Sequence, residues 1–329
     1  MIGALIVVVL LALTVRSAHA EGRIRIAEQF GIVYLLLNVA QEQKLIEKHG
    51  KANGVDISVE WLRLSGGANV NDALLSGSID IAGAGIGPLL TAWDRTVGRQ
   101  NIKGVAGLGN FPYYLVSSNP AVKSIADLSE KDRIAVPSVT VSVQSRFLQL
   151  AAAKLWGDDQ YAKLDKYTVA LPHPDATAAL LAGGTELNGH FSNPPFQYQV
   201  LANPAVKVIL NSYDVIGGAN TPTVLFTTEK FRRENPKTYQ AFVAALEEAS
   251  AFVKANKAAA ADIYLKVSGT KADRADLLKI IESPEVDFTI VPTRTFALAA
   301  FLHRVGAIRN KPARWQDYFF EDARIAAGS

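Results

Sequence analysis

Apolar and polar positions alternate with two different periods along the first 110 residues of the chain. Strict alternation over residues 23–27 and 55–62 predicts two strands, and further strands are predicted at 79–82 and 102–108. Apolar residues recur at helical spacing between them, which predicts helices at 33–49, 68–76 and 89–97. Strands that alternate with helices are typical of a parallel sheet covered by helices, so an α/β fold is expected.

A second series of the same kind lies between Asn110-Phe111-Pro112 and residues 217–220. The predicted strands are 113–117, 133–137, 167–171, 187–191 and 206–210, and the predicted helices are 141–156, 175–182 and one opened by Pro194 and Pro195. A strand at 224–227 and helices at 236–255, 258–267, 273–282 and 293–305 complete the chain. This order predicts a discontinuous first lobe, residues 21–110 with 221–329, and a second lobe, residues 111–220, with a cleft between them.

The N-terminus has the pattern of a secretory signal peptide. Residues 2–15 are almost wholly apolar, and Ala18 and Ala20 fit an A-x-A cleavage site, which predicts cleavage after Ala20 and a periplasmic location. No Lys or Arg precedes the apolar segment, which departs from that pattern. The alternative is an uncleaved anchor, but the segment is shorter than the about 20 residues that span a bilayer.

The composition excludes several kinds of chemistry. The chain has no cysteine, which rules out disulfides, thiol catalysis, cysteine metal sites and the acceptor of an N-terminal lipid anchor. The histidines show no HExxH spacing, and no G-x-S-x-G segment is present. A net charge of +3 without a basic cluster gives no nucleic-acid footprint. We therefore predict no catalytic residue, no metal, no cofactor and no nucleic-acid partner.

The segment 77–90, GSIDIAGAGIGPLL, is the strongest candidate for a binding site. Its strand is predicted to end at Ala82, followed by a turn with Gly83, Gly85 and Gly87 and a helix with Pro88 in its first turn. Unpaired N–H groups at a helix start attract anions, and glycine lets a ligand approach the backbone. The alternative is a plain packing turn.

Two other segments also place polar groups at helix starts. Ser65-Gly66-Gly67 and Gly85-Ile86 are predicted to offer backbone N–H groups to an oxyanion, unless both are only tight turns. In Ser138-Val139-Thr140-Val141-Ser142, one hydroxyl is expected to be the N-cap, and the others can face the ligand from the second lobe. Arg146 follows on the same helix and suits a carboxylate or sulfonate, although a helical arginine is more often solvated or ion-paired.

Aromatic side chains near strand ends are candidates for the wall of the pocket. Phe30, Tyr34, Phe111 and Phe196 are predicted to contact the apolar part of a ligand, with core packing as the alternative. Asn193 lies in a Ser-Asn-Pro-Pro turn, where its amide either binds ligand oxygens or caps its own backbone. The predicted ligand-binding residues are Phe30, Tyr34, Ser65, Gly66, Gly67, Gly85, Ile86, Asn110, Phe111, Thr140, Val141, Ser142, Arg146, Asn193 and Phe196.

Several segments, in this order, resemble the periplasmic solute-binding proteins of nitrate/sulfonate/taurine (NitT/TauT) ABC importers. The segments that carry the resemblance are 30–37, 65–71, 77–90, 137–146, 189–197, 217–223 and 231–249. The resemblance implies a two-lobed periplasmic-binding-protein fold (type II), no enzymatic activity, and a monomer that closes on a small ligand and docks on a permease with its ATPase. Ligands of the family include alkanesulfonates, taurine, nitrate, bicarbonate, aromatic carboxylates and pyrimidines.

Two other functions remain open at this point. A periplasmic sensor that presents its ligand to a receptor would have the same sequence features. A pyrimidine or thiamine-precursor protein of the same fold is the other alternative, but the synthases of that branch resemble proteins with a cysteine-rich motif, and this chain has no cysteine.

Overall fold

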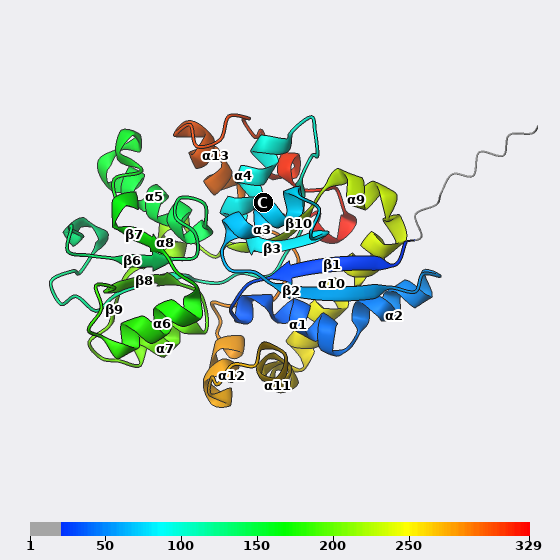
Figure 1. The fold of residues 1–329 in the computed structure, drawn as a ribbon, viewed down its shortest axis with the longest axis horizontal. Helices are drawn as coiled ribbons and strands as arrows, with labels where there is room; N and C mark the ends of the chain where they lie inside the picture. Colours follow the sequence, from blue (N-terminus) through cyan, green and yellow to red (C-terminus); the bar gives the residue numbers. More distant parts are fainter. Residues whose placement is uncertain (1–20) are drawn as a thin grey trace, which may run out of the picture.

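The computed structural model describes residues 21–329, which form two α/β lobes side by side (Figure 1). The predicted signal peptide, residues 1–20, lies outside the described residues. Within residues 21–329, no helix is both long and apolar enough to cross a membrane.

The first lobe is built on a five-stranded sheet in the order β2-β1-β3-β10-β4. Its strands are β1 (Arg23–Glu28), β2 (Ser58–Arg63), β3 (Ile81–Gly85), β4 (Lys103–Gly107) and β10 (Thr223–Thr227). β1 pairs in parallel with β2 and β3, whereas β10 is antiparallel to β3 and β4. The chain therefore returns from the second lobe into the middle of the first sheet.

The second lobe repeats this plan in a sheet of order β7-β6-β8-β5-β9. Its strands are β5 (Tyr114–Ser117), β6 (Ile134–Val136), β7 (Thr168–Ala170), β8 (Gly189–Ser192) and β9 (Lys207–Asn211). β6 is parallel to β7 and β8, and β5 is antiparallel to β8 and β9. Two sheets flanked by helices confirm the predicted α/β fold class.

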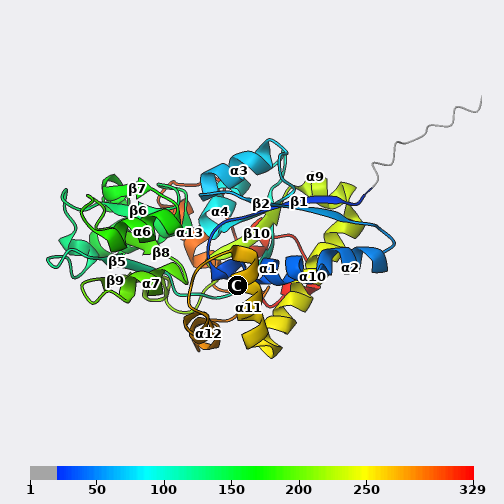
Figure 2. The same cartoon turned by 60° about the horizontal axis from the view of Figure 1, so that its bottom comes forward.

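Helices cover both sheets, and one C-terminal helix reaches across to the second lobe (Figures 1 and 2). The helices are α1 (Leu35–Glu42), α2 (Leu45–Ala52), α3 (Gly67–Leu75), α4 (Ile86–Thr96), α5 (Val143–Trp156), α6 (His173–Ala182), α7 (Phe196–Leu201), α8 (Ser212–Ile216), α9 (Glu229–Glu234), α10 (Pro236–Ala255), α11 (Lys257–Ser268), α12 (Arg274–Glu282) and α13 (Phe296–Arg304). α10 packs on α1 and α2, whereas α13 packs on α5. Phe301 of α13 meets Tyr161 edge-to-face at 6.4 Å, and Arg304 forms an ion pair with Asp158.

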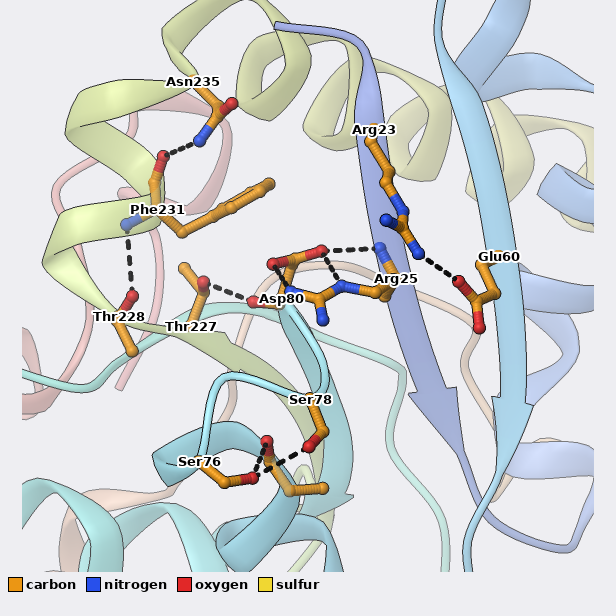
Figure 3. A network of polar contacts seen from close by, with 11 residues as sticks. Arg23, Arg25, Glu60, Ser76, Ser78, Asp80, Thr227, Thr228, Phe231 and Asn235 are labelled. Atoms are coloured by element: carbon orange, nitrogen blue, oxygen red, sulfur yellow. Dashed lines mark hydrogen bonds and ion pairs between the residues drawn. The ribbon is translucent and has the colours of Figure 1, made fainter. Parts of the chain in front are cut away.

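A half-buried polar network holds three strands of the first sheet together at the end shown in Figure 3. Asp80 accepts hydrogen bonds from the Arg25 backbone N–H at 2.8 Å and from the Arg25 guanidinium at 2.7 Å. The Thr227 hydroxyl donates to the Asp80 carbonyl at 2.6 Å. These residues belong to or adjoin β1, β3 and β10, so the network fixes these three strands relative to one another. The opposite ends of the same strands lead to the candidate site described below.

Two of the predicted elements are wrong in detail. The single helix predicted at 33–49 is a 3-10 turn, Ile32–Tyr34, followed by α1 and α2, which are separated at Lys44 in the left-handed conformation (φ 51°). The apolar pattern runs through this break without a glycine or proline to mark it. The short helices α8 and α9 were also missed.

The predicted glycine turn after Ala82 is the second correction. Gly83 and Gly85 lie within β3, and α4 begins at Ile86 rather than at Leu89. A Cβ on Gly83 would lie 2.7 Å from the Ala27 carbonyl oxygen on β1. The absence of side chains here therefore serves close packing rather than a turn.

Candidate functional site

A small cavity lies where the two lobes meet. Its volume is about 20 Å³, which is space for about one water-sized group. Its lining residues come from both lobes: Gln29, Phe30, Tyr34, Gly67, Gly85, Pro88, Tyr113, Pro137, Ser142, Val143, Gln144, His173, Asn193 and Thr223. The lining contains no Asp, Glu, Lys or Arg, so any charge recognition here depends on dipoles and neutral donors.

Direct hydrogen bonds join the lobes around this cavity. The Ile32 N–H donates to the Pro194 carbonyl at 3.0 Å, and the Asn193 amide donates to the Phe30 carbonyl at 3.1 Å. On the opposite side, the Ala68 N–H donates to the Ser138 hydroxyl at 3.3 Å. The structure is therefore a closed form of the cleft.

Glycines of the first lobe allow this close approach. A Cβ on Gly85 would lie 2.8 Å from the Val143 Cβ, and one on Gly87 would lie 2.8 Å from the Val141 carbonyl oxygen. A Cβ on Gly66 would lie 2.6 Å from the Pro137 carbonyl oxygen. These neighbours belong to the second lobe, so each glycine permits contact between lobes.

Three helices, α3, α4 and α5, begin at the cavity with no acidic residue in their first turns, whereas a fourth, α6, begins there at His173 and has the exposed Asp175 in its first turn. Gly67 starts α3, Gly85 is the N-cap of α4, and Ser142 is the N-cap of α5. The Ser142 hydroxyl accepts the Ser145 N–H at 3.3 Å, as expected for one of the three hydroxyls of this segment. Each helix N-terminus has a partial positive charge, so the three together favour an anion.

The remaining polar lining groups are neutral. The Tyr113 and Thr223 hydroxyls are hydrogen-bonded at 2.6 Å, and burial raises the pKa of the Tyr113 phenol. The Tyr34 hydroxyl and the Gln29 amide both donate to the Gly83 carbonyl, each at 3.3 Å. These phenols stay protonated at neutral pH, so they act as hydrogen-bond donors rather than as charges.

Histidine enters the site from the second lobe. His173, at the start of α6, is hydrogen-bonded to the Gln144 amide at 3.1 Å and to His190 on β8 at 2.9 Å. Burial lowers the pKa of His173 to about 3, and burial together with His173 holds the pKa of His190 well below its usual range. Both rings are therefore neutral at pH 7. His190 is fully buried on β8.

Six of the predicted ligand-binding residues line this cavity. They are Phe30, Tyr34, Gly67, Gly85, Ser142 and Asn193. The other nine, Ser65, Gly66, Ile86, Asn110, Phe111, Thr140, Val141, Arg146 and Phe196, do not line it.

Three of these nine residues lie close to the cavity but use their polar groups elsewhere. The Ile86 N–H donates to the Pro222 carbonyl at 2.9 Å, and the Gly66 N–H donates to the Gln29 side chain at 3.0 Å. The Ser65 carbonyl accepts from the Asn69 amide. Their roles are local bonds that hold the turns in place.

Thr140 and Val141 form the turn before α5. Thr140 is exposed with φ 61°, a conformation that β-branched residues seldom adopt. The Val141 carbonyl faces Gly87 across the lobe junction. The turn therefore positions α5 against α4.

Arg146 is buried on α5, away from the cavity lining. Its guanidinium donates to Gln149 at 2.9 Å, and Gln149 donates to Asp165 at 2.8 Å. Burial lowers the pKa of the guanidinium, and its Nε has no partner among the described residues. In this closed form, Arg146 belongs to the packing of the second lobe.

Asn110 and Phe111 belong to the connection between lobes. Asn110 forms an antiparallel bridge with Asp287, and its side chain accepts from the Thr221 hydroxyl at 2.9 Å. Phe111 is fully buried and meets Phe288 edge-to-face at 5.2 Å. The predicted crossings near 110 and 220 are thus joined by a third segment, around residues 287–293.

Phe196 lines a second, larger cavity of about 180 Å³ beside the first. The two cavities share Gln29, Phe30 and Tyr34 as walls. Phe196 also stacks on the His173 ring, with centroids 5.7 Å apart. Four aromatic rings line the second cavity, including Tyr264 of α11, together with the ion pair between Arg63 and Glu28.

Sequence reasoning missed eight lining residues: Gln29, Pro88, Tyr113, Pro137, Val143, Gln144, His173 and Thr223. Val143 and Gln144 directly follow the predicted N-cap hydroxyls, so the helix start was a usable signal. Tyr113 directly precedes β5 and Thr223 begins β10, and no local pattern marks either residue. Within residues 21–329, no group of three or more His, Cys, Asp or Glu side chains could hold a metal ion.

Comparison with known proteins identifies the family to which this chain belongs. The model described as the NMT1-like family matches residues 34–267. No curated protein sequence matches the chain.

Several solved structures have a similar fold. The alkanesulfonate-binding protein SsuA from Xanthomonas axonopodis pv. citri, bound to MOPS, is 19% identical with a TM-score of 0.67, over 88% of this chain and 95% of that one. The periplasmic nitrate-binding protein NrtA from Synechocystis PCC 6803 is 16% identical with a TM-score of 0.70, over 91% and 84%. The periplasmic aliphatic sulphonate-binding protein SsuA from Escherichia coli is 19% identical with a TM-score of 0.63, over 91% and 99%.

These three neighbours are named as binding proteins, and at such identities they show a shared fold. The family model covers more than half of the chain, including α3, α4, α5 and all residues that line the cavity except Gln29 and Phe30. The chain therefore belongs to the NMT1-like family and has the two-lobed fold of periplasmic solute-binding proteins, as its resemblance to the NitT/TauT class implies.

Proposed function

We propose that this protein is the substrate-binding component of an ABC importer and captures a small oxyanion between its lobes. The observation that carries this proposal is the convergence of the α3, α4 and α5 N-termini on one cavity, with no acidic residue in any first turn. A cation would meet three positive helix ends there and no carboxylate. A sulfonate, nitrate or carboxylate group would meet N–H donors and the Ser142 segment.

The proposed cycle consists of opening and closing without chemistry. Residues 21–110 and 221–329 would move as one lobe against residues 111–220, bending near Asn110 and residues 217–220. Because the closed cavity holds about one water-sized group, ligand entry requires the lobes to part. Closure then removes the oxyanion from water, where its bonds to N–H donors are stronger.

The two cavities suggest how a larger ligand would lie. One oxygen of the oxyanion would occupy the small polar cavity, and an apolar part would face the ring of Phe30 towards the cavity of about 180 Å³. A cavity of about 150 Å³ is large enough for benzene, so that space has the size for a short chain or a single ring beside its aromatic residues. Phe30, Tyr34 and Phe196 would supply the contact.

The remaining parts of the proposal concern location and partners. The predicted signal peptide and the absence of cysteine support a free periplasmic protein rather than a lipid-anchored one. The resemblance to the NitT/TauT class and the binding-protein neighbours support a permease and its ATPase as partners, and we propose that the protein acts as a monomer. Neither nucleic acid nor a cofactor is part of this function.

A thermal-shift screen of residues 21–329 tests the proposal. The panel holds nitrate, bicarbonate, methanesulfonate, taurine, benzoate and a pyrimidine, with putrescine as the cationic control. An anion at 100 times its dissociation constant should add about 2.7 kcal/mol to the free energy of unfolding. Stabilisation by putrescine alone, or by no anion after unfolding and refolding to remove any co-purified ligand, would contradict the proposal.

A further inference from the structure

A buried chain of three side chains leads from the cavity into the second lobe. Gln144 lines the cavity, its amide nitrogen Nε2 lies 3.1 Å from His173 Nε2, and His173 Nδ1 lies 2.9 Å from His190 Nε2. All three residues are at least 96% buried. The chain ends at His190 Nδ1, which has no hydrogen-bond partner among the described residues.

The two rings can share their protons in only two ways. A neutral imidazole has one N–H donor and one acceptor nitrogen, so the proton position on His190 determines the one on His173. If His190 has its proton on Nδ1, a buried N–H donor is left without an acceptor. If the proton is on Nε2, it is donated to His173, and only a lone pair of His190 is left unpaired. Buried N–H groups without an acceptor are the rarer and costlier case.

The arrangement with the His190 proton on Nε2 determines which way the Gln144 amide faces. His173 then has its proton on Nε2 and donates it towards Gln144, which must accept it with its side-chain oxygen. The amide is therefore turned over relative to the structure, which has the Gln144 nitrogen at this position. The oxygen and nitrogen of an amide have nearly the same shape, so the network decides their positions. The Gln144 NH2 group is therefore the end that is free to face the cavity.

We propose that Gln144 donates its NH2 group to the bound oxyanion, and that His173 and His190 are positioning residues that hold its amide in this orientation. Gln144 would then exclude ligands that offer only donors to this point of the cavity. His173 cannot turn freely because Phe196 stacks on it with an interplanar angle of 26°. This specificity role rests on the proposed function, whereas the proton arrangement does not.

The proton arrangement can be read directly from ring-nitrogen NMR. After removal of residues 1–20 the chain has four histidines, His49, His173, His190 and His303, so the spectrum is simple to assign with single variants. We expect His173 and His190 at pH 7 to be neutral with the proton on Nε2. A spectrum with the proton of His190 on Nδ1 would overturn the inference, whether or not any ligand is known.

Binding by Gln144 variants tests the specificity role. With methanesulfonate and nitrate as probes, we expect Gln144→Glu to weaken binding at least 100-fold at pH 7, because a carboxylate replaces the donor. Gln144→Met should weaken it about tenfold. Gln160→Glu adds the same charge at an exposed position of the second lobe and should leave binding unchanged.

The two tests separate failure of this inference from failure of the proposed function. Wild-type affinity in a folded Gln144→Glu protein would overturn the donor role. If neither probe binds the wild type, the oxyanion function fails at that point, and the NMR spectrum still decides the orientation of the amide.

Discussion

A Gly85→Val variant should fold normally and lose at least about 100-fold in oxyanion affinity. Gly85 has an ordinary extended conformation (φ −65°, ψ 160°), so its backbone accepts valine without strain. In the closed form, however, its Cβ would lie 2.8 Å from the Val143 Cβ of the other lobe. The side chain therefore opposes closure and also takes space in the cavity that Gly85 lines, and the apparent affinity falls with the population of the closed state. Calorimetric titration with the anion found in the screen measures this.

The matched control for Gly85→Val is Ala259→Val, at an exposed position of α11. It adds the same β-branched side chain away from the lobe junction and should keep wild-type affinity. Urea unfolding of both variants checks that the fold is intact. Wild-type affinity in a folded Gly85→Val protein would mean that the lobes do not close on Gly85.

The second large effect is expected in acid. The unfolded chain protonates His173 near its usual pKa of 6.5, whereas burial holds the folded pKa at about 3. Between these values the unfolded state binds more protons, so the free energy of unfolding falls as the pH drops below 6.5. One such histidine contributes about 1.4 kcal/mol per pH unit, or about 2 kcal/mol at pH 5. The lowered pKa of His190 acts in the same direction.

Urea unfolding at pH 7.5 and pH 5 measures this effect. Wild-type protein should lose about 2 kcal/mol more between the two pH values than His173→Gln does. His303→Gln, on α13, is the control and should follow the wild type. Equal losses in wild type and His173→Gln would show that His173 is not the source of the acid sensitivity.

The fold could largely be predicted from the sequence because local residue patterns mark most of its helices and strands. Alternating strands such as 55–62 and glycine or proline at element ends mark most boundaries, and the two series of strands and helices imply two lobes. The break at Lys44 was missed because the apolar face continues through it. The role of Gly83 was misjudged because the neighbour that excludes a side chain there, the Ala27 carbonyl, is on another strand.

The candidate site could be predicted where it coincides with a helix start, or with an aromatic or amide side chain near a strand end, as at Phe30, Tyr34 and Asn193. Gly67, Gly85 and Ser142 were found because glycine and hydroxyl residues at such positions have a known physical role. Tyr113 and His173 were missed because only the packing of the second lobe on the first brings them to the cavity. Phe196 was predicted to line the ligand pocket as part of an aromatic wall, and it lines the neighbouring cavity of about 180 Å³ instead.

The central claim is that an oxyanion closes the two lobes, and a distance across the cleft tests it most directly. The chain has no cysteine, so Asp72→Cys on the first lobe and Lys166→Cys on the second give two unique labelling sites, both exposed. Electron spin–spin distance measurement should show one shorter, narrower distribution when the anion from the screen is added. The same labels in a Gly85→Val background should keep the longer distances. Saturating anion that binds while the wild-type distribution stays unchanged would contradict the account.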